Sequence, residues 1–299
     1  MNTATPKTIP EYLEQLRYEL RSADPALLQD ALYDAEEYLR SELAENPGTD
    51  EATLLATIAT SYGAPEEVAA IYRDTEVRVA KALSPPPPKA RRSPLGQFFG
   101  VAADSRAWAA LFYMLLSLAT GIVYFTVVTT GLSLSFGLAV LIIGIPFAIL
   151  FVGIVRLLSL VEGRLVEVML GERMPRRPLY AERGLPLLTR IGRMFTDPRT
   201  WSAMLYMVLM LPLGIAYFTI AVTGLSASLA LIYGSLAMGL HLLGLDVFSV
   251  HWYVDTPAAW EVPVAMVLGV VGLFVTLHVA RLVGRGHGLL AKHLLVKSA

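Results

Sequence analysis

The chain has 299 residues, of which 55% are hydrophobic and only 16% are charged, and it contains no cysteine. This composition excludes an ordinary soluble domain, and the missing cysteine excludes disulfides, thiolate nucleophiles and cysteine metal ligands. The net charge of −1 combines an acidic first part with a basic, apolar remainder. Residues 1–81 hold 16 acidic and 7 basic residues, a net charge of −9, and residues 82–299 carry a net charge of +8.

The first part of the chain shows helical patterning. "IPEYLEQLRYEL" places Tyr12, Leu13, Leu16 and Leu20 on one helix face at spacings of three and four residues. In "ADPALLQDALYDAEEYLRSEL", Asp24 is expected to cap a helix whose first residue is Pro25. We therefore predict a compact all-α domain over residues 1–82.

Three segments of this domain resemble the HAAS domain, a small helical cytoplasmic module of bacterial membrane proteins. They are "YLEQLRYEL", "DALYDAEEYLRSEL" and "YGAPEEVAAIY", of which the turn from Gly63 through Pro65 is the most specific. HAAS domains are often encoded beside PadR-like transcription regulators. The resemblance therefore implies a PadR-like regulator as the cytoplasmic partner, with Gly63 and Pro65 as candidates for the docking turn.

Residues 83–96 are predicted to be a linker. Its sequence "LSPPPPKARRSP" contains four consecutive prolines, which favour a stiff polyproline II spacer. The basic residues Lys89, Arg91 and Arg92 are expected to hold its far end near anionic membrane lipids.

The remainder is predicted to be a membrane domain. Residues 107–155 contain no Asp, Glu, Lys, Arg or His. Because a bilayer crossing takes roughly 20 helical residues, we predict spans at about 107–130 and 136–158 with a tight turn near Gly131. Two further spans are predicted at about 200–224 and 263–283. Residues 227–245 remain open, as a longer third helix, an interfacial helix or a re-entrant segment.

The placement of basic residues predicts the orientation of the spans. Lys and Arg precede the first span, fill the loop between the second and third, and follow the last. The positive-inside rule then places both termini and this loop in the cytoplasm. The resemblance to HAAS domains implies that the membrane is the inner membrane of a bacterium.

An internal repeat underlies the membrane domain. "YFTVVTTGLSLS" (124–135) and "YFTIAVTGLSAS" (217–228) are identical at eight of twelve positions, 93 residues apart. The second halves realign with an offset of 125, pairing Gly144 with Gly269, Arg156 with Arg281 and Gly163 with Gly288. We predict two parallel hairpin repeats, over 97–195 and 196–299, that form a four-helix bundle with a pseudo-two-fold axis along the membrane normal. The second repeat carries an extracytoplasmic insertion at about 230–262.

Two sets of residues are candidate binding sites. A lipid or apolar ligand held between the repeats would contact Tyr124, Thr126, Tyr217 and Thr219, although small and polar residues here also suit helix packing. An external sensing or lid role is a hypothesis for the insertion, for which a metal site and an ordinary interfacial hairpin are the alternatives. Its candidate residues are His241, Asp246, His251, Trp252, Asp255 and Trp260.

The chain shows no motif that indicates catalysis. It has no phosphate-binding loop and no nucleophile elbow, and paired carboxylates such as Glu36 and Glu37 are interpreted as solvated helix faces. We expect no catalytic residue, cofactor, bound metal or direct nucleic-acid contact. Apart from Arg156 and Arg281 at their ends, the predicted spans hold essentially no ionisable group except His278, which argues against an ion or proton pathway. The runs 156–170 and 281–295 are expected to lie on the anionic membrane face or to extend their spans.

The membrane domain resembles the "putative sensor" domain that precedes certain bacterial histidine kinases. The segments that carry this resemblance are "LGIAYFTIAVTGLS", "VLIIGIPFAIL", "RLLSLVEGRLVEVMLGE" and "VDTPAAWEVPVAMVLGVVGL". It implies a non-enzymatic membrane sensor that relays a membrane or external cue through the helical domain. The alternatives are an accessory or scaffold subunit of a membrane complex, for example an ABC exporter, and a lipid-binding membrane protein. Homo-oligomerisation remains open.

Overall fold

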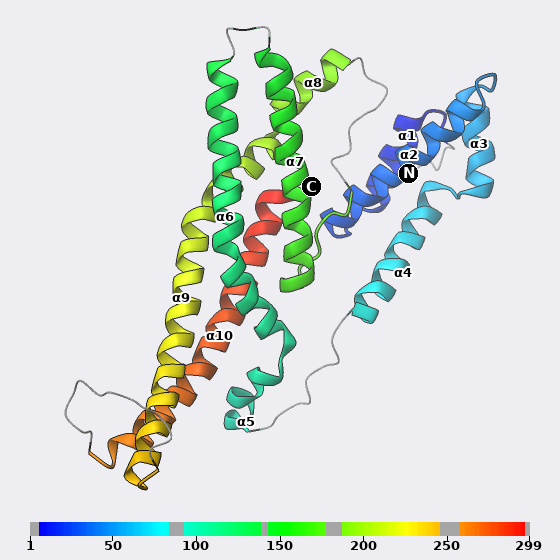
Figure 1. The fold of residues 1–299 in the computed structure, drawn as a ribbon. Helices are drawn as coiled ribbons and strands as arrows, with labels where there is room; N and C mark the ends of the chain where they lie inside the picture. Colours follow the sequence, from blue (N-terminus) through cyan, green and yellow to red (C-terminus); the bar gives the residue numbers. More distant parts are fainter. Residues whose placement is uncertain are drawn as a thin grey trace.

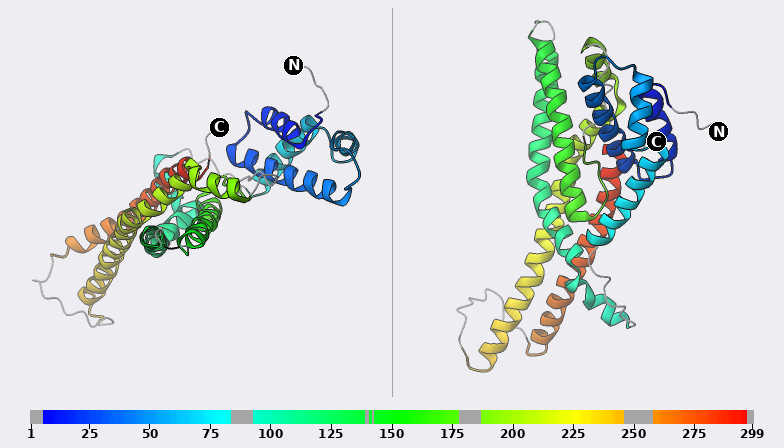
Figure 2. Two further views of the ribbon diagram at one scale, coloured as in Figure 1. Left: turned by 90° about the horizontal axis from the view of Figure 1, so that it is seen from above. Right: turned by 90° about the vertical axis from the view of Figure 1, so that its right-hand side faces the viewer.

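The computed structural model describes residues 6–83, 93–138, 141, 143–177, 187–245 and 258–296. These residues form helices and connecting turns, and no strand occurs among them. The all-α class predicted from the sequence is therefore confirmed. A short helical head lies beside a long bundle, next to α7 and the C-terminal end of the chain (Figures 1 and 2).

The head is formed by α1 (Ile9–Glu19), α2 (Pro25–Glu45), α3 (Glu51–Ser61) and α4 (Pro65–Leu83). Asp24 caps α2, as predicted, by accepting a hydrogen bond from the backbone N–H of Ala26. The predicted apolar face of α1 is buried, and Leu16 and Leu20 have no exposed surface. The head therefore has its own hydrophobic core.

Four helices of the second part are long and apolar enough to cross a membrane by length and composition. They are α6 (Ser105–Gly137), α7 (Gly144–Leu170), α9 (Pro198–Leu242) and α10 (Glu261–Leu295). The short helices α5 (Pro94–Phe99) and η1 (Gly100–Ala103) precede α6, and α8 (Leu187–Thr196) precedes α9. The protein is thus a multi-pass helical membrane protein.

The open question about residues 227–245 is settled in favour of a longer third helix, because α9 continues unbroken to Leu242. The runs 156–170 and 281–295 are likewise continuous with α7 and α10. They extend the long helices, which was one of the two interpretations of their sequence.

The turn predicted near Gly131 is wrong, because α6 continues through it to Gly137. Gly131 is instead a packing position: a Cβ atom there would lie 2.1 Å from the ring of Phe151 on α7. Its repeat equivalent, Gly224, faces Thr276 on α10 in the same way, with a Cβ 2.6 Å from the hydroxyl oxygen. The repeated glycine therefore brings the two helices of each hairpin close together.

The predicted parallel arrangement of the two hairpins is also wrong, because α6 and α9 run antiparallel (Figure 1). A Cβ on Gly121 would lie 2.5 Å from the carbonyl oxygen of Met210, and one on Gly214 would lie 2.3 Å from that of Ser117. Residues later on α6 thus face residues earlier on α9. The pseudo-two-fold axis therefore runs across the helices and not along them. The sequence repeat does not indicate the relative direction of the two hairpins.

Candidate functional site

A carboxylate lies buried at the centre of the bundle. Glu162 on α7 has no exposed surface. Its Oε1 accepts hydrogen bonds from the hydroxyls of Tyr113 (2.6 Å) and Tyr206 (2.8 Å), and its Oε2 accepts one from Tyr124 (2.9 Å). An ionised carboxylate away from water is costly unless such donors surround it. The three hydroxyls offset part of that cost and fix the carboxylate in place.

An imidazole contacts the same tyrosines from α10. His287 is 1% exposed, and its Nε2 lies 2.6 Å from the hydroxyl of Tyr113 and 2.8 Å from that of Tyr206. Its Nδ1 lies 3.3 Å from the hydroxyl of Tyr217. Two tyrosine hydroxyls therefore touch both the carboxylate and the imidazole. We call Tyr113, Tyr124, Glu162, Tyr206, Tyr217 and His287 the central cluster.

The central cluster follows the internal repeat. The offset of 93 relates Tyr113 to Tyr206 and Tyr124 to Tyr217, and the offset of 125 relates Glu162 to His287. Each ionisable group contacts both tyrosines of its own repeat and the first tyrosine of the other repeat. The pseudo-two-fold axis thus passes between an acid and a base.

Two ion pairs connect the repeats on either side of the central cluster. Arg281 contacts Asp104 (Nε to Oδ2, 3.3 Å), and its repeat equivalent Arg156 contacts Asp197 (Nη2 to Oδ2, 3.3 Å). Both aspartates also cap their own helices, because Oδ1 accepts a hydrogen bond from the backbone N–H two residues on. The same repeated residues therefore start each helix and attach it to the other hairpin.

The structure divides the candidate inter-repeat residues into two groups. Tyr124 is buried and Tyr217 half-buried, and both belong to the central cluster between the repeats. Thr126 and Thr219 are exposed on the outside of the bundle. Thr219 donates a hydrogen bond to a carbonyl of its own helix, that of Ile215. The hypothesis of a ligand between the repeats stays a prediction.

Most of the candidate external residues lie outside the described part of the chain, namely Asp246, His251, Trp252 and Asp255. His241 lies in the last turn of α9, and Trp260 is exposed just before α10. Among the described residues no group of three or more His, Asp or Glu side chains could hold a metal ion. An external sensing role for this segment stays a prediction.

The turn predicted to dock a partner serves the head itself. Gly63 has a φ of +112°, which favours glycine, and its carbonyl accepts a 2.8 Å hydrogen bond from the Tyr12 hydroxyl. Pro65 is buried at the start of α4. The turn therefore connects α3 and α4 to α1, and its role toward a partner stays a prediction.

Glu162 and His287 lie inside the bundle but beyond the predicted spans 136–158 and 263–283, so the argument against a proton pathway from the content of those spans does not extend to them. Both fall within the runs 156–170 and 281–295, whose mixed composition suggested the membrane surface. A signal was nevertheless available, because the same offset of 125 that pairs Gly163 with Gly288 pairs the residues just before them.

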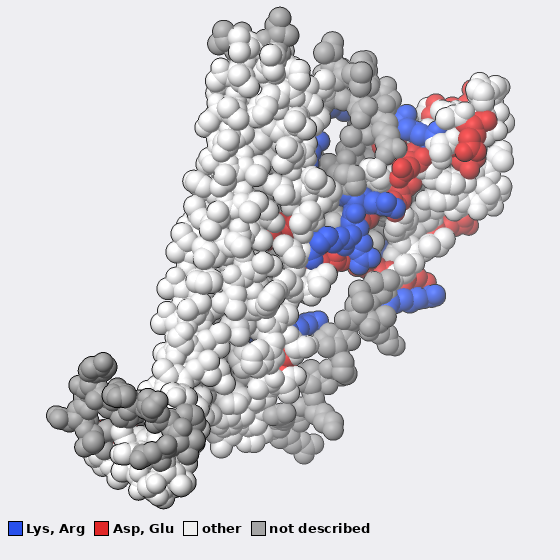
Figure 3. Space-filling model, viewed as in Figure 1, with Lys and Arg blue, Asp and Glu red and all other residues white. Residues whose placement is uncertain are grey.

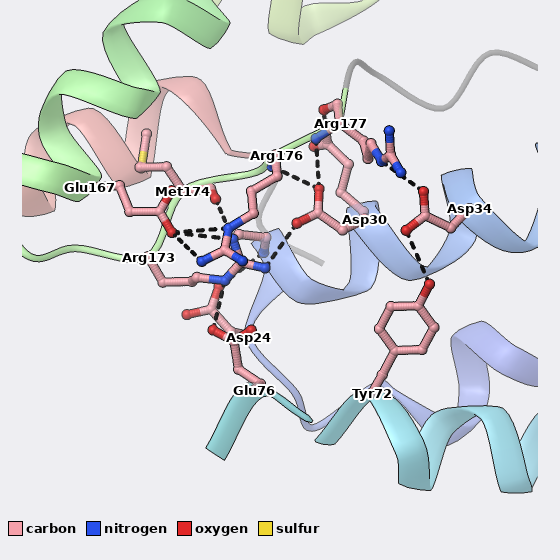
Figure 4. A network of polar contacts seen from close by, with 12 residues as sticks. Asp24, Asp30, Asp34, Tyr72, Glu76, Glu167, Arg173, Met174, Arg176 and Arg177 are labelled. Atoms are coloured by element: carbon pink, nitrogen blue, oxygen red, sulfur yellow. Dashed lines mark hydrogen bonds and ion pairs between the residues drawn. The ribbon is translucent and has the colours of Figure 1, made fainter. Parts of the chain in front are cut away.

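A second polar network joins the head to the membrane domain (Figure 4). Oδ1 of Asp30 on α2 accepts hydrogen bonds from the backbone N–H groups of Arg176 (2.7 Å) and Arg177 (2.8 Å). Its Oδ2 contacts Nη2 of Arg173 at 2.8 Å. Arg173 also pairs with Glu76 of α4 (2.7 Å) and Glu167 of α7 (3.5 Å). The loop after α7 is thus held between the head and its own helix.

Further contacts extend this junction, which we call the head contact. Gln29 donates to the carbonyl of Arg177 and accepts from Nη2 of Arg199, at the start of α9. Lys292 near the end of α10 pairs with Asp24 at 2.6 Å, and Arg177 pairs with Asp34 at 2.7 Å. On the face shown in Figure 3, charged side chains gather on the head and at this junction, while the bundle surface is almost wholly uncharged.

Burial has a measurable consequence for Asp30. Loss of water around the carboxyl raises its pKa above the ordinary value, and this outweighs the lowering by the backbone N–H of Arg177 and by the charge of Arg173. The head contact therefore contains an acid whose ionised form is less favourable there than in water.

The four long apolar helices, the internal repeat and the buried polar cluster define a multi-pass helical membrane protein. Comparison with protein families identifies residues 113–295 as matching the family described as "Putative sensor". This match covers more than half of the chain, and the protein belongs to that family. No curated protein and no solved structure matches the chain. The matched region includes all six residues of the central cluster, whereas the resemblance of the head to HAAS domains stays a prediction.

Proposed function

We propose that the protein is a non-enzymatic membrane sensor in which the state of the central cluster controls the docking of the head. The proposal rests on one observation. Glu162 of the central cluster lies on α7, and α7 leads directly into the loop whose backbone binds Asp30 of the head. Gly171 ends the helix with a φ of +79°, and Met174 just beyond it is fully buried against the bundle core. A displacement of α7 would therefore move the groups that Asp30 binds.

The connection from cluster to head passes through few groups. Glu167 lies on α7 between Glu162 and the loop, and it contacts both Arg173 and Arg176. Glu172 packs against Gly288, next to His287, so that the loop touches α10 as well. These contacts give both ionisable residues of the cluster a short path to the head contact.

We further propose that the chain lies in a bacterial inner membrane with the head on the cytoplasmic side. The distribution of Lys and Arg supports a cytoplasmic head and predicts both termini on that side. Because the antiparallel α6 and α9 begin at opposite ends of the bundle, a cytoplasmic position for both termini stays a prediction. The undocked head would expose acidic residues of α2 to a basic surface of a cytoplasmic partner, for which the HAAS resemblance suggests a PadR-like regulator.

Binding of a candidate PadR-like regulator to the full-length protein tests this proposal. Arg173→Glu places a negative charge against Asp30 and Glu76 and should release the head, so we expect regulator binding to increase. Arg285→Glu, at an exposed position of α10, is the matched control. Equal binding to wild type and both variants would count against the partner role, and stable association with a membrane permease instead would favour an accessory subunit.

A further inference from the structure

The hydrogen bonds of the central cluster restrict where its protons can lie. A tyrosine hydroxyl has one proton to donate, and an ionised carboxylate only accepts. With Glu162 ionised, the hydroxyls of Tyr113, Tyr124 and Tyr206 all donate to it. The oxygens of Tyr113 and Tyr206 can then only accept from His287, so Nε2 of the imidazole must carry a proton.

Charge decides the state of the second ring nitrogen. If Nδ1 accepts from Tyr217, the imidazole is neutral and the buried cluster carries a net charge of −1. If Nδ1 is protonated and donates to Tyr217, the cluster is neutral overall. An unbalanced charge in the interior carries the desolvation penalty of a buried ion, so the neutral arrangement with one more proton is favoured.

The same number of protons fits a second arrangement. A proton on Oε1 of Glu162 would be donated to the oxygen of Tyr113, and the Tyr113 proton would be donated to Nε2 of His287. The two arrangements differ only by the movement of two protons along two hydrogen bonds, each 2.6 Å long. Tyr206 provides an equivalent bridge with two contacts of 2.8 Å.

We infer that Glu162 and His287 form one proton-binding site, in which a single proton is held in common and passes between Oε1 and Nε2 through the hydroxyl of Tyr113 or Tyr206. In each transfer the bridging oxygen gains one proton and loses another, so no other bond changes. Buried ionisable groups in membrane helices commonly serve proton transfer, which the chemistry of this pair allows. The inference rests on the proposed function in one respect only, namely that a change in the protonation of this site would alter the docking of the head.

The central cluster contains no charged side chain besides those of Glu162 and His287. Among the described residues, the titratable groups that contact Glu162 or His287 are Tyr113 from α6 and Tyr206 from α9, together with Tyr124 and Tyr217. The charged side chain of Glu172 packs on Gly288, the residue after His287. The arginines on either side are each paired with an aspartate, in Arg156–Asp197 and Arg281–Asp104.

Nuclear magnetic resonance of the full-length protein in nanodiscs tests the inference. Replacing the other four histidines (His241, His251, His278 and His293) by Gln leaves the nitrogen signals of His287 alone, because the chain has five histidines. The carboxyl carbon of Glu162 is assigned by its loss in Glu162→Gln. Coupled groups lose protons in steps that belong to the pair and not to either group alone. We therefore expect the His287 nitrogen and the Glu162 carbon to report a common midpoint for each step. A midpoint reported by only one of the two nuclei in the wild type would overturn the inference.

The bridging tyrosines provide the discriminating variants. Tyr113→Phe and Tyr206→Phe each leave one bridge and should keep the common midpoint. The double variant removes both bridges, and we expect its two midpoints to separate by about one pH unit or more, the size of coupling that joins two titrations. Tyr124→Phe is the matched control, because it removes a contact of Glu162 without removing a bridge. A common midpoint that persists in the double variant would exclude the tyrosine relay.

Two further outcomes are informative. If neither signal titrates, the protonation form of His287 should still differ between wild type and Glu162→Gln, and identical forms would overturn the inference. Head docking measured in the same samples separates the two proposals. A shared proton without any change in docking would leave the proton site standing and reject the coupling to the head.

Discussion

Glu162 and His287 occupy equivalent positions in two repeats and meet at the pseudo-two-fold axis, each within 2.6 Å of the Tyr113 hydroxyl. An exact duplication would place two acids or two bases against each other there. The pair instead consists of one group that accepts protons as a carboxylate and one that carries them as an imidazole. Divergence of a repeated position has thus produced a complementary pair in the centre of the bundle.

The glycines at the crossing of α6 and α9 should be intolerant of side chains. Gly121→Ala and Gly214→Ala each force a methyl group against a backbone carbonyl of the other helix, which cannot rotate away. We expect each to lower the free energy of unfolding by about 1–3 kcal/mol, the usual cost of overpacking. Thermal unfolding in detergent measures this. Gly153→Ala, with nothing within 4 Å of the added atom, is the control and should be neutral or slightly stabilising.

The antiparallel packing makes a specific cross-linking prediction, which the absence of native cysteine makes simple to test. Leu111 and Ala221 belong to the same buried apolar cluster, so the pair Leu111→Cys and Ala221→Cys should cross-link in membranes. A parallel arrangement would bring Leu111 close to its repeat equivalent, Met204. Preferential cross-linking of the Leu111→Cys, Met204→Cys pair would contradict the packing described above.

The two arginines that pair with aspartates of α2 should differ in their effect on head docking. The Arg173 side chain is 14% exposed and meets three carboxylates, whereas that of Arg177 is 50% exposed and pairs with Asp34 alone. Removing a partner from a buried ion pair typically costs about 3–5 kcal/mol, while an exposed pair contributes about 0–1 kcal/mol. Arg173→Ala should therefore release the head, and Arg177→Ala should barely affect it. Hydrogen exchange of the α2 amides in the two variants measures the difference.

The free energy of unfolding should depend on pH through Asp30. Its pKa is raised above the ordinary carboxyl value, so the folded protein binds this proton more tightly than the unfolded chain does. This contribution to stability is fully present below the ordinary pKa and is lost as pH rises through the raised one. Above that range this contribution is constant. Asp30→Asn should remove the dependence, and an unchanged pH profile in that variant would show that another group is responsible.

The sequence predicted the architecture through periodicity and capping, both of which act locally. Asp24 caps the helix that its position indicated, and Asp104 and Asp197 cap α6 and α9 in the same way. The repeat also identified equivalent residues correctly, and Tyr124 and Tyr217 belong to the site. Periodicity and capping depend on residues that are close to one another in the sequence, so they can be recognised without knowledge of the packing.

The relative direction of the helices and the burial of individual side chains could not be predicted in the same way. Gly131 is compatible with a turn or with a close helix contact, and the ring of Phe151, which belongs to the other helix, decides between them. Similarly, "RLLSLVEGRLVEVML" has the mixed composition of a surface helix. Its one buried acid is stabilised by hydroxyls from α6 and α9, and single-helix patterning contains no information about those partners.

The coupling between the central cluster and the head is tested most directly by one distance measurement. Labels at Thr49→Cys in the head and Val168→Cys on α7 report docking, since both positions are exposed. We predict that Glu162→Gln broadens or lengthens the distance distribution relative to the wild type, while Thr126→Ala, an exposed position on α6, leaves it unchanged. An unchanged distribution in Glu162→Gln, with the His287 signals altered in the same sample, would show that the cluster does not control the head.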